Sequence, residues 1–212
     1  MSIVSANFHH DFGLANRLFI FAVTYAYAKK HGKKMVFLKD FYHRFTIHSR
    51  IDYTNIFFSG IPFQNSDGLN LTKYNEKLFF KYDPIPFIES DVFLNGCYQS
   101  EKYFEDYKQD IYNRYSCPDQ VEKNLHSTFK QLAKACFIHV RRGDFMYLPK
   151  YDLKLFDKYY PTAIESVLEK SREKKEDVFF YVLSNDLQWC TQHPLFKKLH
   201  NDKILDFIDC NE

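Results

Sequence analysis

Residues 135–145 read ACFIHVRRGDF, and this segment is the strongest indication of fold in the sequence. Its apolar run is typical of a buried strand, which delivers the polar RRGD segment, residues 141–144, to its carboxyl end. A second apolar run, DVFFYVL at 177–183, follows a predicted helix at 159–173 whose apolar residues share one face. Strands that alternate with helices in this way indicate an α/β fold with a parallel sheet.

The N-terminal part of the chain has the same order of elements. An apolar run at 3–8 precedes a helical pattern that starts at Leu14, and Gly32 can end that helix in the left-handed conformation. The MVFL run at 35–38 then predicts a strand. Strand, helix and strand form a βαβ unit, which is expected to be parallel and right-handed.

The remaining elements have weaker signals. They are mixed short elements over 41–82, a strand at 92–94, a helix opened by Ser100, a helical region at 107–134, a helical turn at 187–190 and a strand at 204–208. We therefore expect two α/β domains, at 1–130 and 131–212. Because ligands of open α/β sheets bind beyond the carboxyl ends of the strands, a cleft between the domains is the expected site.

Composition excludes several classes of protein. The 212 residues are 45% apolar and 26% charged, so the chain can bury enough surface to fold and is not intrinsically disordered. The formal net charge of +2 gives no general attraction for nucleic acid, and no nucleic-acid partner is expected. Any anion must therefore bind in a local pocket of positive charge.

The cysteines and the apolar runs indicate in which cellular compartment the protein is expected. The five cysteines are an odd number without Cys-x-x-Cys spacing, which favours free thiols over a zinc cage or a disulfide framework. No apolar run approaches the roughly 20 residues that span a bilayer, and the N-terminus has no secretory signal. We expect a cytoplasmic protein, or one at the periphery of a membrane, and the sequence leaves its oligomeric state open.

The RRGD segment is the strongest candidate site. Arg141 and Arg142 supply the planar, bidentate donors that a diphosphate needs, and Gly143 lets the backbone turn beside the anion. Asp144 can orient an arginine, and His139 points to the same side of the strand as Arg141. Two other interpretations stay open, which are a surface Arg-Asp ion pair of little energetic value and an RGD adhesion tripeptide.

The segment HHDFGLANR at 9–17 is the second candidate. A strand-to-helix loop with a glycine, Gly13, can offer backbone N–H groups to a phosphate or a sugar hydroxyl. The alternative is a plain connection in which Asn16 caps the helix. His9 and His10 would face opposite ways on a strand, so a shared metal ion is not expected.

The strand at 177–183 leads to the third candidate, Ser184-Asn185-Asp186. Small polar residues at this position suit hydrogen bonds to a base or a ribose. The alternative is a helix N-cap by Ser184 or Asn185.

Five segments in order resemble a known family. The HVRRGDF segment at 139–145 resembles the H-x-R-R-x-D-Y motif of the α-1,2-fucosyltransferases, glycosyltransferase family eleven. The other four similar blocks are GLANRLFIFAVTYAYAKKHG at 13–32, GCYQSEKYFED at 96–106, YYPTAIE at 159–165 and FYVLSNDLQWC at 180–190. Together the blocks span nearly the whole chain, and five in order are far more specific than any one.

The resemblance implies a GT-B architecture, with two Rossmann-like domains facing a cleft. It implies an inverting glycosyltransferase that moves L-fucose from GDP-β-L-fucose to a galactose-containing acceptor in an α-1,2 linkage. It implies no metal and no cofactor besides the donor substrate, and its partners are a nucleotide sugar and a glycan acceptor. By this resemblance Arg141 and Arg142 hold the donor diphosphate and stabilise the leaving GDP. The other residues implied to contact the substrates are His139, Ser184, Asn185 and Asp186 near guanine and ribose, and Gly13, Asn16 and Arg17 in the N-terminal loop.

The sequence also departs from the family pattern. Phe145 stands where the family has Tyr, Ala15 replaces a glycine and Arg17 replaces a glutamine. Nothing matches the family's final Ser-rich F-S-W-W segment, so we expect an incomplete C-terminal domain. The missing segment supports an alternative, a non-catalytic module that binds a nucleotide sugar or a glycan.

The general base and the donor also stay open. An inverting transfer must remove a proton from the acceptor hydroxyl, and Asp144, Glu101 and Asp11 are candidates by their chemistry alone. A transferase that uses another nucleotide sugar is a third interpretation.

Overall fold

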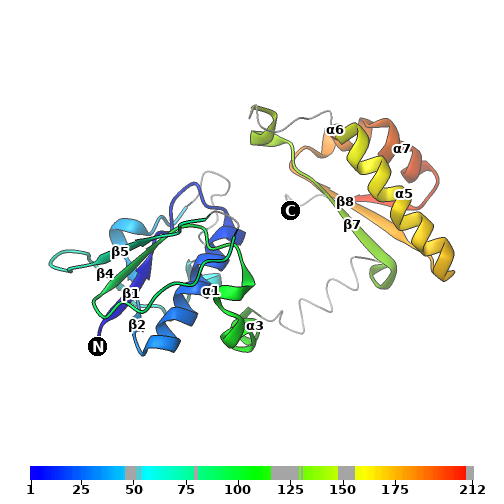
Figure 1. Cartoon of the computed structure of the whole chain (residues 1–212). Coiled ribbons are helices and arrows are strands. Elements are labelled where there is room, and N and C mark those ends of the chain that lie inside the picture. Colours follow the sequence, from blue (N-terminus) through cyan, green and yellow to red (C-terminus); the bar gives the residue numbers. More distant parts are fainter. Residues whose placement is uncertain are drawn as a thin grey trace. The chain divides into compact units, whose positions relative to one another are not determined.

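The computed structural model describes residues 1–45, 52, 54–78, 81–115, 129, 131–147 and 156–208, with only the backbone of Asp144, Phe145 and Phe156. The chain divides into two compact units, Met1–Ser116 and Cys117–Glu212. Each unit has its own parallel sheet (Figure 1). Two α/β regions are therefore confirmed. The expected division near residue 130 falls where Phe129 alone is described between 116 and 130, and it stays a prediction, as does the cleft.

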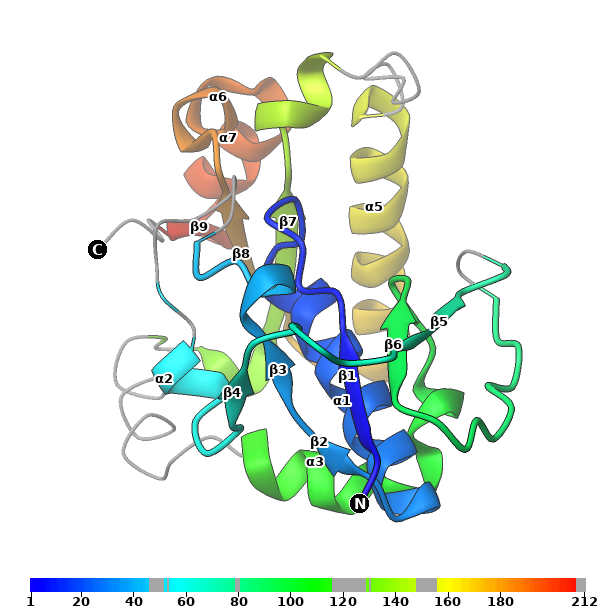
Figure 2. The ribbon, with the colours of Figure 1, turned by 90° about the vertical axis from the view of Figure 1, so that its left-hand side faces the viewer.

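The first unit is built on a four-stranded sheet in the order β2-β1-β6-β5, and all its pairs are parallel. Its strands are β1 (Ile3–Ala6), β2 (Lys34–Met35), β5 (Thr72–Asn75) and β6 (Val92–Asn95). Helix α1 (Leu14–His31) connects β1 to β2, as the predicted βαβ unit requires (Figure 2). Gly32 ends α1 with φ of 61°, which confirms the predicted glycine cap.

The buried residues of this sheet alternate between two apolar clusters. Val4 and Leu94 pack with α1 in the larger cluster, whereas Ile3 and Phe93 pack with Val36 in a smaller one. This is the period-two alternation of strands that are covered on both faces. The sheet therefore holds α1 and the loop before it in a fixed place at the carboxyl end of β1.

Shorter elements complete the first unit. They are β3 (Phe37–Leu38), η1 (Lys39–Phe41), α2 (Thr54–Phe57), β4 (Phe63–Gln64), η2 (Glu101–Tyr103), η3 (Glu105–Tyr107) and α3 (Lys108–Tyr115). The predicted strand at 35–38 is divided, because Phe37 and Leu38 pair with β4 in a separate sheet. Ser100 precedes η2 as predicted, but its side chain makes no capping hydrogen bond.

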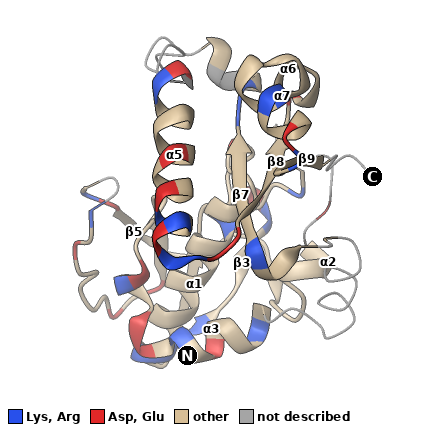
Figure 3. Ribbon diagram, turned by 90° about the vertical axis from the view of Figure 1, so that its right-hand side faces the viewer, with Lys and Arg blue, Asp and Glu red and all other residues tan. Residues whose placement is uncertain are grey.

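The second unit has a three-stranded parallel sheet in the order β7-β8-β9. Its elements are η4 (Leu132–Lys134), β7 (Ala135–Val140), η5 (Gly143–Tyr147), α5 (Phe156–Lys174), β8 (Phe179–Ser184), α6 (Leu187–Gln192), α7 (Pro194–Asn201) and β9 (Leu205–Ile208). The three α-helices lie on one face of the sheet (Figure 1). Charged residues of both signs are spread along the ribbon of α5 (Figure 3), as on a helix with one solvated face.

The core of the second unit follows from this layering. Ile138, Val140, Phe180 and Val182 are buried beneath the helices, together with Phe196 of α7. The predicted strands and helix of this region are confirmed, whereas α7 was not predicted. Among the described residues, no helix is long and apolar enough to cross a membrane.

Candidate functional site

Polar side chains lock together the carboxyl ends of β7 and β8. Val140 and Ser184 are paired across the two strands. The Ser184 hydroxyl donates to the Val140 carbonyl at 2.7 Å and accepts from the Asp186 N–H at 2.9 Å. Because these hydrogen bonds involve the last residue of each strand, the two following loops leave the sheet in a defined direction.

Asn185 holds the loop that follows β7. Its Oδ1 accepts a hydrogen bond from the Arg142 backbone N–H at 2.9 Å. Gly143 has φ of +24°, and a methyl group at this residue would lie 2.3 Å from Asn185 Nδ2. Glycine is thus required here both for the backbone conformation and for the close approach of the amide.

Arg142 is fixed on two sides. Its Nε donates to Asp186 Oδ2 at 2.9 Å, and its guanidinium lies 4.0 Å from the centroid of the Trp189 ring. The side chain is only 13% exposed, so this ion pair is screened less than a surface pair. Arg142 therefore has a clear role in positioning the loop.

Asp186 is also the residue that caps the next helix, α6. Its Oδ1 accepts from the Trp189 N–H at 3.1 Å, so Asp186 is the N-cap of α6. The predicted cap by Ser184 or Asn185 is wrong, because Ser184 still belongs to β8 and Asn185 faces the other loop. The predicted contacts of these three residues with guanine and ribose stay predictions.

Arg141 and His139 differ from Arg142 in their surroundings. Arg141 is half-buried, and His139 is exposed between the buried Ile138 and Val140, as on a strand with one covered face. The backbone of Asp144 belongs to η5, but its side chain lies outside the described residues, as does that of Phe145. The diphosphate role of Arg141 and the roles of Asp144 stay predictions.

Two groups near this site stay protonated at neutral pH. Burial raises the pKa of the Cys190 thiol, and burial raises the pKa of Tyr160 to about 12. The Tyr160 hydroxyl donates to the His139 carbonyl at 3.1 Å. Neither group can therefore act as a general base without a change in its surroundings.

In the first unit, Arg17 organises the loop between β1 and α1. It is fully buried, with Nε donating to the Phe12 carbonyl at 3.0 Å and Nη2 donating to the His9 carbonyl at 3.2 Å. The resemblance implied that this arginine is among the residues that contact the substrates, and this role stays a prediction. In the structure its side chain is buried and fixes the loop that contains Gly13.

Asn16 links this loop to another family block. Its Oδ1 accepts from Gln99 Nε2, and the N-cap of α1 is Gly13 without a side-chain hydrogen bond. The interpretation of Asn16 as a helix cap is therefore wrong. Sequence reasoning also missed Glu76, whose Oε2 accepts from the N–H groups of Cys97 and Tyr98 at 2.7 and 3.1 Å and so fixes the segment before Gln99.

The expectation that His9 and His10 face opposite ways is wrong. Their rings lie side by side, 4.1 Å apart between centroids, and both approach Asp11. Residues 10 and 11 form a turn after Phe8, so the alternation of a strand does not apply to them. Asp11, a candidate general base, is thus in contact with two imidazoles. Glu101, another candidate, has Oε2 3.1 Å from Lys108 Nζ.

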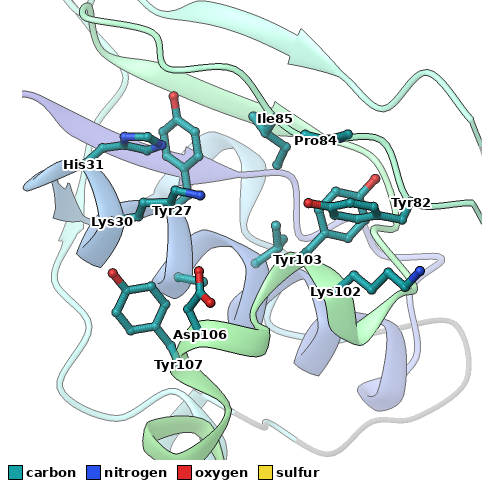
Figure 4. Close-up of a pocket in the computed structure, with 12 residues that line it drawn as sticks. Tyr27, Lys30, His31, Tyr82, Pro84, Ile85, Lys102, Tyr103, Asp106 and Tyr107 are labelled. Atoms are coloured by element: carbon teal, nitrogen blue, oxygen red, sulfur yellow. The ribbon is translucent and has the colours of Figure 1, made fainter.

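Two of the cavities in the first unit lie beside α1. The larger, about 540 Å³, is lined mainly by apolar side chains of α1, η2 and α3, and it reaches Ala15, Gln99 and Ser100 near the loop. The smaller, about 90 Å³, lies beside the last turns of α1, where Tyr27, Lys30 and Tyr103 surround it (Figure 4). The lining of the smaller cavity starts at Val23, nine residues or about 14 Å along α1 from Leu14, so this cavity is separate from the loop that precedes α1.

Comparisons with known proteins identify a family and a fold. A family model described as Glycosyl transferase family 11 matches residues 67–204. A structure of NodZ alpha-1,6-fucosyltransferase soaked with GDP-fucose is similar over 99% of this chain and 78% of its own, at 12% identity and a TM-score of 0.52. The selenomethionine form of fucosyltransferase NodZ from Bradyrhizobium has the same identity and coverage, and a TM-score of 0.50. No curated protein matches. The likeness confirms an α/β fold of the GT-B kind.

Proposed function

The chain belongs to glycosyl transferase family 11, and from this we propose that it transfers L-fucose from GDP-β-L-fucose to a galactose-containing acceptor. The linkage formed is α-1,2, and the anomeric carbon is inverted. The family resemblance supports the donor and the linkage. A NodZ structure that shares the fold is named as an alpha-1,6-fucosyltransferase soaked with GDP-fucose, which supports the donor and leaves the linkage to experiment.

One observation carries the proposal, which is the braced loop at the carboxyl ends of β7 and β8. Asn185 holds the backbone of Arg142, and Asp186 holds its side chain. These contacts also limit the direction in which the side chain of the neighbouring Arg141 can project. Donors that are held in place before the reaction cost no reorganisation when charge develops on the leaving diphosphate. Arg141 is the residue that we assign to this charge.

The transfer is a single displacement at the anomeric carbon. The acceptor oxygen forms the new bond while the bond to the diphosphate breaks, and the GDP leaves with the electron pair. The acceptor proton passes to a base, for which Asp144, Glu101, Asp11 and the donor's own phosphate are the candidates. The exposed His139, Ser184 and the second unit's Asn185-Asp186 pair are proposed to contact the nucleoside.

GDP binding tests the proposal. We expect isothermal titration calorimetry to detect GDP binding that Arg141→Ala weakens by about 2–4 kcal/mol, because a charge-assisted diphosphate contact is lost. Arg172→Ala is the matched control, since Arg172 lies on the surface of α5 and pairs with Glu165. Absence of GDP binding, or binding that Arg141→Ala does not change, would contradict the proposal. UDP and dTDP as competitors would reveal another nucleotide sugar.

A second candidate function is a non-catalytic nucleotide-sugar or glycan-binding module. It is favoured by the engagement of two predicted cations, since Arg17 is buried against carbonyl groups and Arg142 is paired with Asp186. Release of GDP from GDP-fucose in the presence of a panel of β-galactosides would exclude this candidate. The linkage of the product, determined by NMR, would decide between α-1,2 and other linkages.

A further inference from the structure

We propose that His9, His10, Asp11 and His43 form a binding site for a divalent transition-metal ion, with Zn²⁺ as the best fit. Imidazole and carboxylate together are ligands that zinc prefers. In the part of the chain that the structure describes, His9, His10 and Asp11 are the one group of three or more potential ligands whose donor atoms lie within 4.8 Å of one another.

The distances between donor atoms already approach those of a metal site. His9 Nδ1 lies 3.1 Å from Asp11 Oδ2, and His10 Nε2 lies 3.0 Å from Asp11 Oδ1. Around a tetrahedral zinc ion with bonds of 2.0–2.1 Å, neighbouring donor atoms are about 3.4 Å apart. The two distances end on different Asp11 oxygens, so one imidazole nitrogen must shift toward the oxygen that binds the ion.

His43 adds a third imidazole from a different segment. Its ring centroid lies 5.7 Å from that of His9 and 5.4 Å from that of His10. Three imidazoles on one zinc ion place their ring centroids about 5 Å apart, given the same bond lengths. The pairs with His43 are close to this spacing, and the pair of His9 and His10 must open by about 1 Å, which exposed side chains can do.

The backbone holds the two segments together before any ion binds. The Phe8 N–H donates to the Phe41 carbonyl at 2.9 Å, and the His43 N–H donates to the Phe8 carbonyl at 3.2 Å. Phe8 itself is completely buried, with its ring 5.6 Å from that of Tyr42. The ligands therefore project from segments anchored in the core, so little ordering entropy is lost on binding.

The local charges allow a cation. Arg17 is a positive group behind the loop, and its charge opposes metal binding. Asp11 offsets it with a carboxylate in direct contact with both imidazoles. His9 Nδ1 also lies 3.3 Å from the Asp11 N–H, so it cannot donate to the carboxylate and accept from this N–H with the same atom. A metal ion bound to Nδ1 takes the lone pair of this nitrogen and so replaces the hydrogen bond from the Asp11 N–H.

The inference is tested separately from the proposed transfer reaction, because zinc binding is measured without nucleotide or acceptor. An ion bound to Asp11 would occupy that carboxylate and leave Asp144, Glu101 and the donor's own phosphate as the candidate bases. The bound ion would join the loop between β1 and α1 to the segment after η1. We therefore expect it to stabilise the first unit.

Competition with a chromophoric chelator tests the site on the full chain. We expect one Zn²⁺ per chain, and we expect His9→Ala, His10→Ala, Asp11→Asn and His43→Ala each to weaken binding by about tenfold or more, since even outer-shell changes cost this much. His31→Ala is the matched control, because His31 lies at the far end of α1 beside Tyr27 and Phe87. Circular dichroism of each variant confirms that it is folded.

Cobalt substitution tests which atoms bind. Co²⁺ at this site should give the visible bands of tetrahedral nitrogen and oxygen ligation, without the near-ultraviolet charge-transfer band of a cysteine thiolate. A thiolate band would move the site to the cysteines and overturn the proposal. The proposal is also overturned if Zn²⁺ binding does not saturate, or if it survives the His9→Ala/His43→Ala double variant.

Discussion

The loops that follow β7 and β1 are each held in place by polar side chains, but these side chains come from opposite sides of the loop. Both leave the carboxyl end of a parallel strand, where α/β proteins bind ligands. After β7, the side chains of Asn185 and Asp186 hold the loop from outside, and the two arginines stay within the loop. After β1, the buried Arg17 holds the loop from inside through carbonyl groups, and the imidazoles of His9 and His10 are presented outward. A segment that resembles the family can thus contain either the side chains that are presented for binding or the side chain that holds the loop in place.

The largest expected effect comes from the internal support. Arg17→Ala removes two hydrogen bonds and leaves a cavity at a completely buried position, so we expect the first unit to lose about 3–5 kcal/mol of stability. Circular dichroism should show an earlier unfolding transition. The protein has a single tryptophan, Trp189, whose fluorescence reports on the second unit and should change little. An unchanged first transition would mean that the loop does not depend on Arg17.

The external support is weaker, and Gly143→Ala tests it. The new methyl group would displace the Asn185 amide and strain the backbone, at a cost of about 2 kcal/mol. Gly60→Ala is the control, since φ there is +78° but no atom lies within 4 Å of the added methyl, so only strain of about 1 kcal/mol is expected. Urea unfolding followed by Trp189 fluorescence measures the first variant, and circular dichroism the second. Equal costs would mean that the Asn185 contact contributes nothing.

Two substitutions of Asp186 separate the contribution of the helix cap from that of the ion pair with Arg142. Asp186→Ala removes both the helix cap and the partner of Arg142, and we expect a loss of about 1.5 kcal/mol. Asp186→Asn keeps a good cap and removes only the charge, so about 0.5 kcal/mol is expected, and this part should shrink in high salt. Urea unfolding at low and high salt measures both. If the two variants lose equally, the ion pair is the dominant contribution.

The predictable parts of the molecule are those with local patterns. The strands at 135–140 and 179–184 are apolar runs, and α1 is a helical pattern that ends at Gly32, so each could be read from neighbouring residues. Helix α7 was missed because it is short and mostly polar. In the candidate site, Arg141 and Arg142 were found from their position after a strand.

The contacts that decide the loops were not predictable. Glu76 bonds to N–H groups 21 and 22 residues away, and Asn185 reaches Arg142 across 43 residues. Such pairs form only when the sheet brings distant segments together. The burial of Arg17 is of the same kind, because an arginine in the first turn of a helix can point inward or outward, and the sequence alone does not say which.

The smallest expected effect is a pH dependence confined to the first unit. Burial lowers the pKa of His31, and the charges of Lys30 and Lys33 lower it further. The unfolded chain then takes up a proton at a higher pH than the folded chain, near the ordinary value of 6.5. Stability of the first unit is therefore complete above this pH and is lost as the pH falls through the window below it.

His31→Gln should flatten this acid loss in thermal unfolding followed by circular dichroism, measured with a chelator present to exclude metal ions. Part of the slope should remain, because burial and neighbouring positive groups also lower the pKa of His43. Lys30→Gln removes one of the two flanking charges and should narrow the window without closing it. If His31→Gln leaves the dependence of stability on pH unchanged, then the fold does not hold His31 neutral. The two units then differ only in the hydrogen bonds that hold their loops.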